Sequence, residues 1–63
     1  MQTFGALVRK ARKRVDMTQV GLAQKAKVDP GTVARIERDE QRPSARVKRV
    51  LVRILGVAPE RET

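Results

Sequence analysis

The stretch MTQVGLAQKAKVDPGTVARIERDEQRP, residues 17–43, decides the fold of this chain. Its strongest local pattern is the pair Asp29-Pro30. Here an N-cap residue is followed by proline at the first helical position, where the missing N–H removes no hydrogen bond. Val33 and Ile36 come next, at helical spacing. These residues predict a short helix whose apolar side is formed by Val33 and Ile36.

A second short helix precedes this one. Thr18 is typical of a helix N-cap. The apolar residues that follow it at helical spacing are Leu22, Ala23 and Ala26. Only Lys27 and Val28 separate this helix from Asp29. Two short helices joined by so few residues must cross steeply, which is the geometry of a helix-turn-helix unit, and we place this unit at about residues 18–38.

Apolar stripes predict one helix on each side of this unit. Thr3 is an N-cap for a helix over about residues 3–15, and Ser44 is an N-cap for a helix that stops at Gly56. The stripe of the first helix is Phe4, Leu7, Val8, Ala11 and Val15. The stripe of the last helix is Val47, Val50, Leu51, Ile54 and Leu55. We expect both stripes to lie in the core.

The remaining segments are connections. Residues 39–44 have no periodicity and contain a proline, and the tail 57–63 can hold one further turn from Pro59 before a frayed end. No segment has the alternation of a strand. The sequence therefore predicts one compact all-α domain of four to five helices over residues 1–63.

Composition excludes several kinds of chemistry. The chain has no cysteine and no histidine, so disulfides, thiolate or imidazole metal sites and histidine acid–base catalysis are excluded. We expect no enzyme activity, no metal and no cofactor, because no side chains resemble a nucleophile with its base. No apolar run approaches the ~20 residues that span a bilayer, and the N-terminus lacks a secretory signal. A cytoplasmic protein is expected.

Charge indicates the partner. Fifteen Lys and Arg residues against seven Asp and Glu give a net charge of +8 and a pI near 11.4. Residues 1–16 and 42–56 hold most of the basic side chains, with only Asp16 as an acid, which suggests one polarised face. This balance predicts an anionic partner, either nucleic acid or a membrane surface, although it also suits a merely solubilising surface.

From Met17 onward the chain resembles the Cro and repressor family of lambdoid phages, within the wider xenobiotic-response-element class of bacterial regulators. The matching positions are Thr18, Gln19, Leu22, Ala23, Val28, Thr32, Val33, Ile36 and Glu37, followed by the Arg42-Pro43 loop. The resemblance implies a lambda-repressor-like fold and a double-stranded DNA partner. It further implies a Cro-like repressor that binds its operator as a homodimer, in a bacterial cell or a phage-infected host.

The resemblance also implies which residues read bases. In this class the N-terminal part of the second helix of the motif enters the major groove. The outward residues there are Asp29, Pro30, Gly31, Thr32 and Arg35. Arg35 is the leading reader, because arginine binds guanine O6 and N7 bidentately, although it can also contact a phosphate or solvent. Asp29 can accept from cytosine or act only as an N-cap, and Thr32 can contact the groove or pack. Pro30 and Gly31 stand where relatives often carry glutamine, so DNA shape is expected to contribute to specificity.

A second set is expected at the phosphate backbone: Thr18, Gln19, Lys27, Arg42, Ser44, Arg46 and Arg12. Gln19 resembles the residue that binds a phosphate together with the N–H groups of its helix. Arg42 can instead approach the minor groove. Arg12 is expected first to pair with Glu37, whose carboxylate is disfavoured by the helix dipole in the last turn, and second to approach a phosphate.

Two departures from the family pattern matter. Lys27 occupies the turn position where relatives usually have glycine, and a positive φ there costs on the order of 1 kcal/mol relative to glycine. The chain also lacks the Trp or Leu pair with which the family's last helix seals the core and the dimer.

Two other functions remain open from the sequence. An antitoxin-type autorepressor would bind a protein partner as well as DNA. A cationic membrane-active protein would use the basic, amphipathic helix at residues 3–15. No separate ligand-sensing domain is evident, so we expect no small-molecule ligand and no membrane partner for the preferred function.

Overall fold

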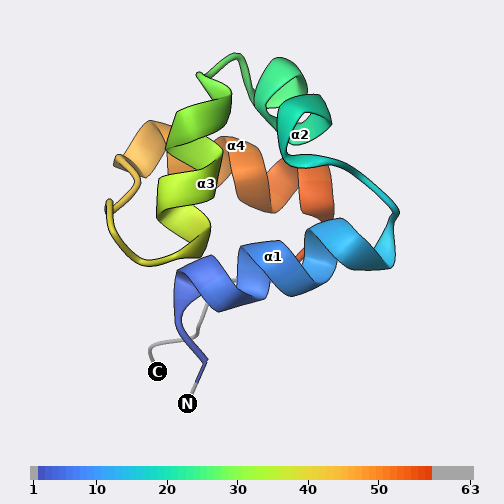
Figure 1. Ribbon diagram of the computed structural model, residues 1–63, viewed down its shortest axis with the longest axis horizontal. Helices are drawn as coiled ribbons and strands as arrows, with labels where there is room; N and C mark the ends of the chain where they lie inside the picture. The colour runs from blue at the N-terminus through green and yellow to red at the C-terminus, as the bar shows by residue number, and fades with distance from the viewer. Residues whose placement is uncertain (1, 58–63) are drawn as a thin grey trace.

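The computed structural model describes residues 2–57, in which there are four α-helices and no strand (Figure 1). They are α1 (Phe4–Arg14), α2 (Gln19–Ala26), α3 (Pro30–Glu37) and α4 (Ala45–Leu55). Each helix begins and ends within about two residues of its predicted bounds, so the predicted all-α fold is confirmed. The turn predicted from Pro59 lies outside the described residues.

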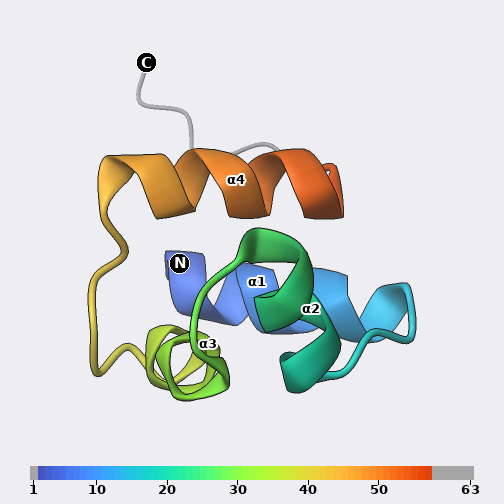
Figure 2. The same cartoon turned by 90° about the horizontal axis from the view of Figure 1, so that it is seen from above.

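Each helix packs against two others. α2 contacts α3 and α4, and α1 contacts the same two helices. From above, α4 lies on one side of the molecule and α3 on the other, and the segment between them runs along one edge (Figure 2). The outer side of α3 is therefore not covered by another helix of the described chain.

Small and branched aliphatic side chains form the core. The buried apolar residues are Val8, Ala11, Leu22, Ala23, Ala26, Val33, Ile36 and Leu51. The other side chains of the α4 stripe are partly buried against this cluster. Val15 was predicted to belong to the α1 stripe, and this was wrong: α1 ends at Arg14, and Val15 is 50% exposed.

The four predicted N-caps all accept a hydrogen bond from the first turn of their helix. The pairs are Thr3 with the N–H of Ala6, Thr18 with Gly21, Asp29 with Gly31 and Ser44 with Val47. Each cap satisfies a backbone donor that has no partner within its helix. Local sequence therefore fixes where every helix begins.

Among the described residues, α4 is the only helix followed by a glycine in the left-handed conformation. Gly56 follows α4 with φ 67°, as expected, but Asp16, Lys27 and Asp39 adopt the same left-handed conformation at the ends of α1, α2 and α3. Lys27 has φ 59° and ψ 46°. At these three ends, backbone N–H groups reach back to the last free carbonyls of the helix, as in a Schellman motif. These hydrogen bonds form although each of the three residues carries a Cβ, which makes a positive φ less favourable than in glycine.

α1 and α3 approach each other closely at Gly5. A Cβ at this position would overlap the carbonyl oxygen of Ile36 and would lie 2.7 Å from Oδ1 of Asp39. Asp39 also accepts a hydrogen bond of 3.0 Å from the hydroxyl of Thr3. Gly5 has no apolar side chain and stands outside the stripe that predicted α1, so its packing role was not predicted.

Candidate nucleic-acid interface

α3 is divided along its length into a buried and an exposed side. Val33 and Ile36 are 0% and 1% exposed, and they fix the helix against the core. Asp29, Pro30 and Arg35 are exposed on the outer side, whereas Gly31 and Thr32 are partly buried. The structure thus brings the predicted base-reading residues together on one uncovered surface of about two helical turns.

Asp29 has its capping oxygen engaged within the helix. Its Oδ2 accepts from the Gly31 N–H at 2.8 Å, which leaves Oδ1 as the other acceptor of this exposed side chain. The N-cap role is therefore structural, and it leaves room for the second role predicted for this carboxylate.

Arg35 is held by a residue that was not predicted to take part in the site. Its Nε donates to Oε1 of Gln41 at 2.9 Å, and both side chains are exposed. Gln41 lies in the loop after α3, and no sequence pattern distinguishes it from a solvated loop residue. Only the fold of that loop brings it beside Arg35.

An ion pair ties the helix-turn-helix to α1. Arg12 Nε and Nη2 donate to the Glu37 carboxylate at 2.6 and 3.1 Å, and Nη1 donates to the carbonyl oxygen of Met17 at 2.8 Å. The two side chains are only 11% and 3% exposed. Because all three nitrogens of the guanidinium have protein partners, Arg12 has a structural role and little of it is available to a phosphate.

Gln19 joins the same network from α2. Its Nε2 donates to Oε1 of Glu37 at 3.1 Å, so Glu37 receives hydrogen bonds from both other helices near it. Gln19 was predicted at a phosphate. An amide carries two N–H groups, and the bond to Glu37 uses one of them. The position of Gln19 in the first turn of α2 remains compatible with a phosphate contact through the second.

Opposing influences act on the pKa of Glu37. Burial acts to raise it, but hydrogen bonds from Arg12 and Gln19, with the positive charges of Arg12 and Arg9, outweigh burial and hold it below the ordinary value of 4.5. The hydrogen bond to Glu37 in turn raises the pKa of Arg12. Glu37 is therefore ionised in the folded protein well below neutral pH.

The remaining predicted phosphate-contact residues are all exposed, and two of them are also helix caps. Thr18 and Ser44 cap α2 and α4, Lys27 lies at the α2–α3 turn, and Arg42 and Arg46 flank the start of α4. Thr18, Ser44 and Arg46 lie at helix N-termini, where backbone N–H groups add to the attraction for an anion, whereas Lys27 is the C-cap of α2.

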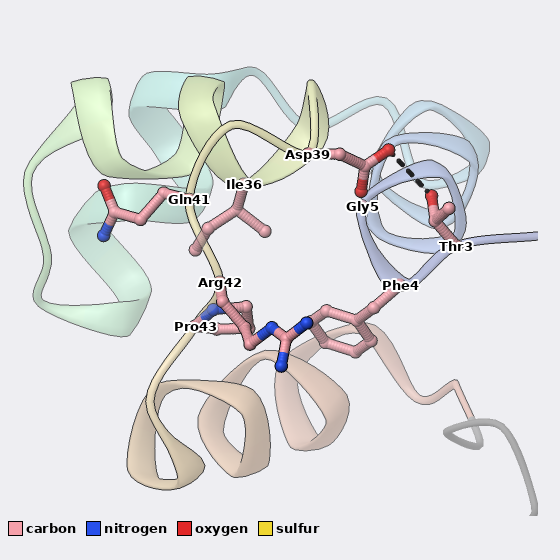
Figure 3. A pocket seen from close by; sticks show the side chains of 8 residues that line it. All are labelled: Thr3, Phe4, Gly5, Ile36, Asp39, Gln41, Arg42 and Pro43. Carbon is pink, nitrogen blue, oxygen red and sulfur yellow. Dashed lines mark hydrogen bonds between the residues drawn. The ribbon is translucent and has the colours of Figure 1, made fainter.

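A pocket of about 380 Å³ separates the start of α1 from the loop after α3 (Figure 3). Phe4, Ile36 and Pro43 line its apolar part, and the side chain of Arg42 extends toward the Phe4 ring. Gln41 stands at the rim, on the side of α3. The pocket contains none of the exposed residues of α3, but it borders the candidate interface through Gln41 and Arg42.

Most of the positive charge lies on α1 and α4. The exposed basic residues of these helices are Arg9, Lys10, Lys13, Arg14, Arg46, Lys48, Arg49 and Arg53, and neither helix contains an acid. α4 lies on the side of the molecule opposite α3 (Figure 2). The charge that the sequence pattern assigned to one face is therefore distributed over two helices.

Residues 2–57 contain no group of acidic side chains arranged to hold a metal ion. Within the same range, no helix is long and apolar enough to cross a membrane. Every buried side-chain nitrogen or oxygen of these residues has a hydrogen-bond partner. Among residues 2–57, any polar side-chain atom that has no partner within the protein is therefore exposed at the surface.

Comparison with known proteins agrees with this geometry. A family model described as a helix-turn-helix domain matches residues 3–63, nearly the whole chain. Searches of curated proteins and of solved structures found no match. The steeply crossed α2 and α3, the lambda-repressor-like packing of α1 and α4 around them, and the family match lead to one conclusion: this chain belongs to the helix-turn-helix domain family, a family of DNA-binding regulators.

Proposed function

We propose that this chain is a sequence-specific transcriptional regulator that binds double-stranded DNA by placing the N-terminal half of α3 in the major groove. The observation that carries the proposal is the exposed side of α3, where Asp29 and Arg35 present an acceptor and a donor to solvent while Val33 is completely buried. A helix oriented in this way can enter the groove without losing its contacts to the core.

The finer proposal is a Cro-like repressor that binds its operator as a homodimer. Recognition helices in such dimers lie ~34 Å apart, one helical turn of DNA. The described residues extend over 32 × 22 × 19 Å, so two copies side by side along the duplex suit this spacing. Occupancy of the operator would block the polymerase, in the cytoplasm of a bacterial cell or of a phage-infected host, without a chemical step.

The proposed phosphate contacts surround the reading surface. Thr18, Gln19 and Lys27 belong to α2 and the turn, and Arg42, Ser44 and Arg46 to the start of α4. They would fix the register of α3 on the duplex without reading sequence. The basic side chains of α1 and α4 would raise affinity for any duplex and make it dependent on salt.

Titration of a labelled promoter fragment from beside the gene, and of a scrambled duplex, tests this proposal across a series of salt concentrations. A sequence-specific regulator is expected to bind the cognate fragment ~10³-fold more tightly or better at physiological salt. Arg35→Ala should reduce this ratio, whereas Arg46→Ala should weaken both duplexes alike. Equal affinities with a steep salt slope, about −0.9 per neutralised phosphate, would contradict the proposal. Tighter binding to acidic vesicles than to either duplex would favour the membrane-active alternative.

A further inference from the structure

Arg35 does not extend freely into solvent from α3. Side chains on a helix lean toward its N-terminus, so that of Arg35 passes over the residue one turn earlier, Gly31. A Cβ on Gly31 would lie 3.2 Å from Nη1 and 3.8 Å from Cζ of Arg35. The guanidinium therefore lies directly over position 31, in space that any larger residue would reduce.

The opposite edge of the same guanidinium is fixed by Gln41. Nε donates to Oε1 of Gln41 at 2.9 Å, and among residues 2–57 neither Nη group has a hydrogen-bond partner. A guanidinium has five N–H groups. With Nε occupied, the four N–H groups of Nη1 and Nη2 remain, and they form a fork that matches two neighbouring acceptors.

The nearest carboxylate of the loop does not compete for this fork. Glu40 precedes Gln41, and its charge interacts with that of Arg35, but both of its oxygens accept from Arg38, at 3.1 Å each. The Arg38–Glu40 pair thus occupies the side chain that could otherwise neutralise Arg35. The side chain that holds Arg35 in place is therefore the uncharged amide of Gln41 rather than a carboxylate.

Resting on the proposed function, we propose that Gln41 is a specificity-determining positioning residue, which holds Arg35 over Gly31 so that Nη1 and Nη2 bind O6 and N7 of a guanine. Guanine offers two acceptors at this edge, whereas adenine replaces one of them with an amino donor that the fork cannot accommodate. An arginine ordered before binding loses less rotamer freedom when it meets the base. Gln41 contributes this order from outside the helix-turn-helix itself.

The space over position 31 is limited from two sides. A Cβ on Gly31 would lie 2.8 Å from Oδ2 of Asp29 as well as 3.2 Å from Nη1 of Arg35. Glycine leaves this space to the guanidinium of Arg35, and the direction of that side chain depends on its contact with Gln41 in the next loop.

Selection from a duplex library with randomised positions, followed by sequencing, tests the proposal without a known operator. The proteins compared are the wild type, Arg35→Ala, Gln41→Ala, Gln41→Glu and the control Gln2→Ala, which removes an exposed glutamine far along the chain from α3. The wild type and the control are expected to select the same half-site, with guanine preferred roughly tenfold over adenine at one position. Arg35→Ala should abolish that preference.

Gln41→Ala is the decisive variant. It should reduce the guanine preference at the Arg35 position to about threefold or less and leave the other positions unchanged, with a melting temperature equal to that of the wild type. Gln41→Glu keeps an acceptor for Nε, so it should restore the guanine preference while lowering affinity for every duplex through its negative charge.

Three results would overturn the inference about Gln41 without contradicting the proposed function. Gln41→Ala could retain the full guanine preference, lose preference at another position because Gln41 reads a base itself, or lower affinity for all sequences equally. In each case the wild type would still select a motif, and sequence-specific binding would stand. If the wild type enriches no sequence, the proposed function fails and this inference fails with it.

Discussion

The helix-turn-helix pair and the two helices that hold it differ in where their charge and their buried surface lie. α2 and α3 contribute most of the buried side chains and carry only two exposed charges, Lys25 and Arg35. α1 and α4 contribute fewer core residues but most of the basic ones, with no acid in either helix. The proposed base reading and the electrostatic attraction thus fall on different elements, and substitutions should separate them.

Besides buried apolar side chains such as Val8, specific contacts fix α1 to the motif. Arg12 joins it to Glu37 by an ion pair, and Gly5 lets the two backbones meet at Ile36. If these contacts hold the two regions together, disrupting them should destabilise the whole fold. Changes within the α2–α3 turn should have smaller effects.

The largest effect is expected from Arg12→Ala. This variant leaves the buried carboxylate of Glu37 without its partner, and breaking a buried pair in this way costs about 3 kcal/mol or more. Urea unfolding followed by circular dichroism measures the loss. Arg9→Ala removes an exposed charge from the same helix and should change the free energy of unfolding by no more than about 0.5 kcal/mol. Equal effects of the two variants would mean that the pair does not join the regions.

Gly5→Ala should destabilise the protein by roughly 2 kcal/mol, because the new methyl group meets the backbone carbonyl of Ile36, which cannot move alone. The steric term exceeds the gain of up to about 1 kcal/mol that alanine offers as a helix former. The control is Gly21→Ala in α2, where the added Cβ would lie 3.1 Å from the capping hydroxyl of Thr18, a side-chain atom rather than a backbone carbonyl, so a smaller effect is expected. A thermal melt that is unchanged for Gly5→Ala would disprove the close approach of α1 and α3.

Lowering the pH should gradually weaken the Arg12–Glu37 ion pair that joins α1 to α3. The pKa of Glu37 is lower in the folded than in the unfolded protein, so its contribution is complete above the unfolded value, near 4.5, and is lost as the pH falls through the folded pKa. Unfolding measured from neutral pH to about pH 3 should therefore show decreasing stability. Glu37→Gln, which cannot titrate, should be less stable at neutral pH and show a flatter dependence. Parallel pH profiles for the two proteins would contradict this assignment.

The smallest effect is expected within the turn. Lys27→Gly relieves a left-handed lysine and should stabilise the fold by about 1 kcal/mol, which corresponds to a rise of roughly 4–8 °C in Tm for a domain of this size. Lys27→Ala removes the same charge but keeps a Cβ, so it should give no such rise. If both variants melt alike, the strain is already offset by the backbone hydrogen bonds of the turn.

The fold was predicted well from the sequence because helix starts and buried helix sides are set by residues that lie close together along the chain. Asp29-Pro30 and the three hydroxyl caps mark the helix starts through contacts two or three residues away, and apolar spacing predicted the side of α3 that is buried. Val15 was misplaced because helical spacing continues past the residue at which a helix ends. The left-handed conformations of Asp16 and Asp39 went unpredicted, since aspartate at a helix end has several uses.

The sequence by itself determined the four helices, the short turn between α2 and α3 and the positive charge, and it predicted the side chains that we propose contact DNA. The tertiary structure alone decided which of these side chains are engaged within the protein. It engages Arg12 and one amide N–H of Gln19 with Glu37, places Gln41 beside Arg35, and brings Gly5 against Ile36. These contacts join residues from different helices and loops, and their geometry depends on how the helices pack rather than on spacing along the chain.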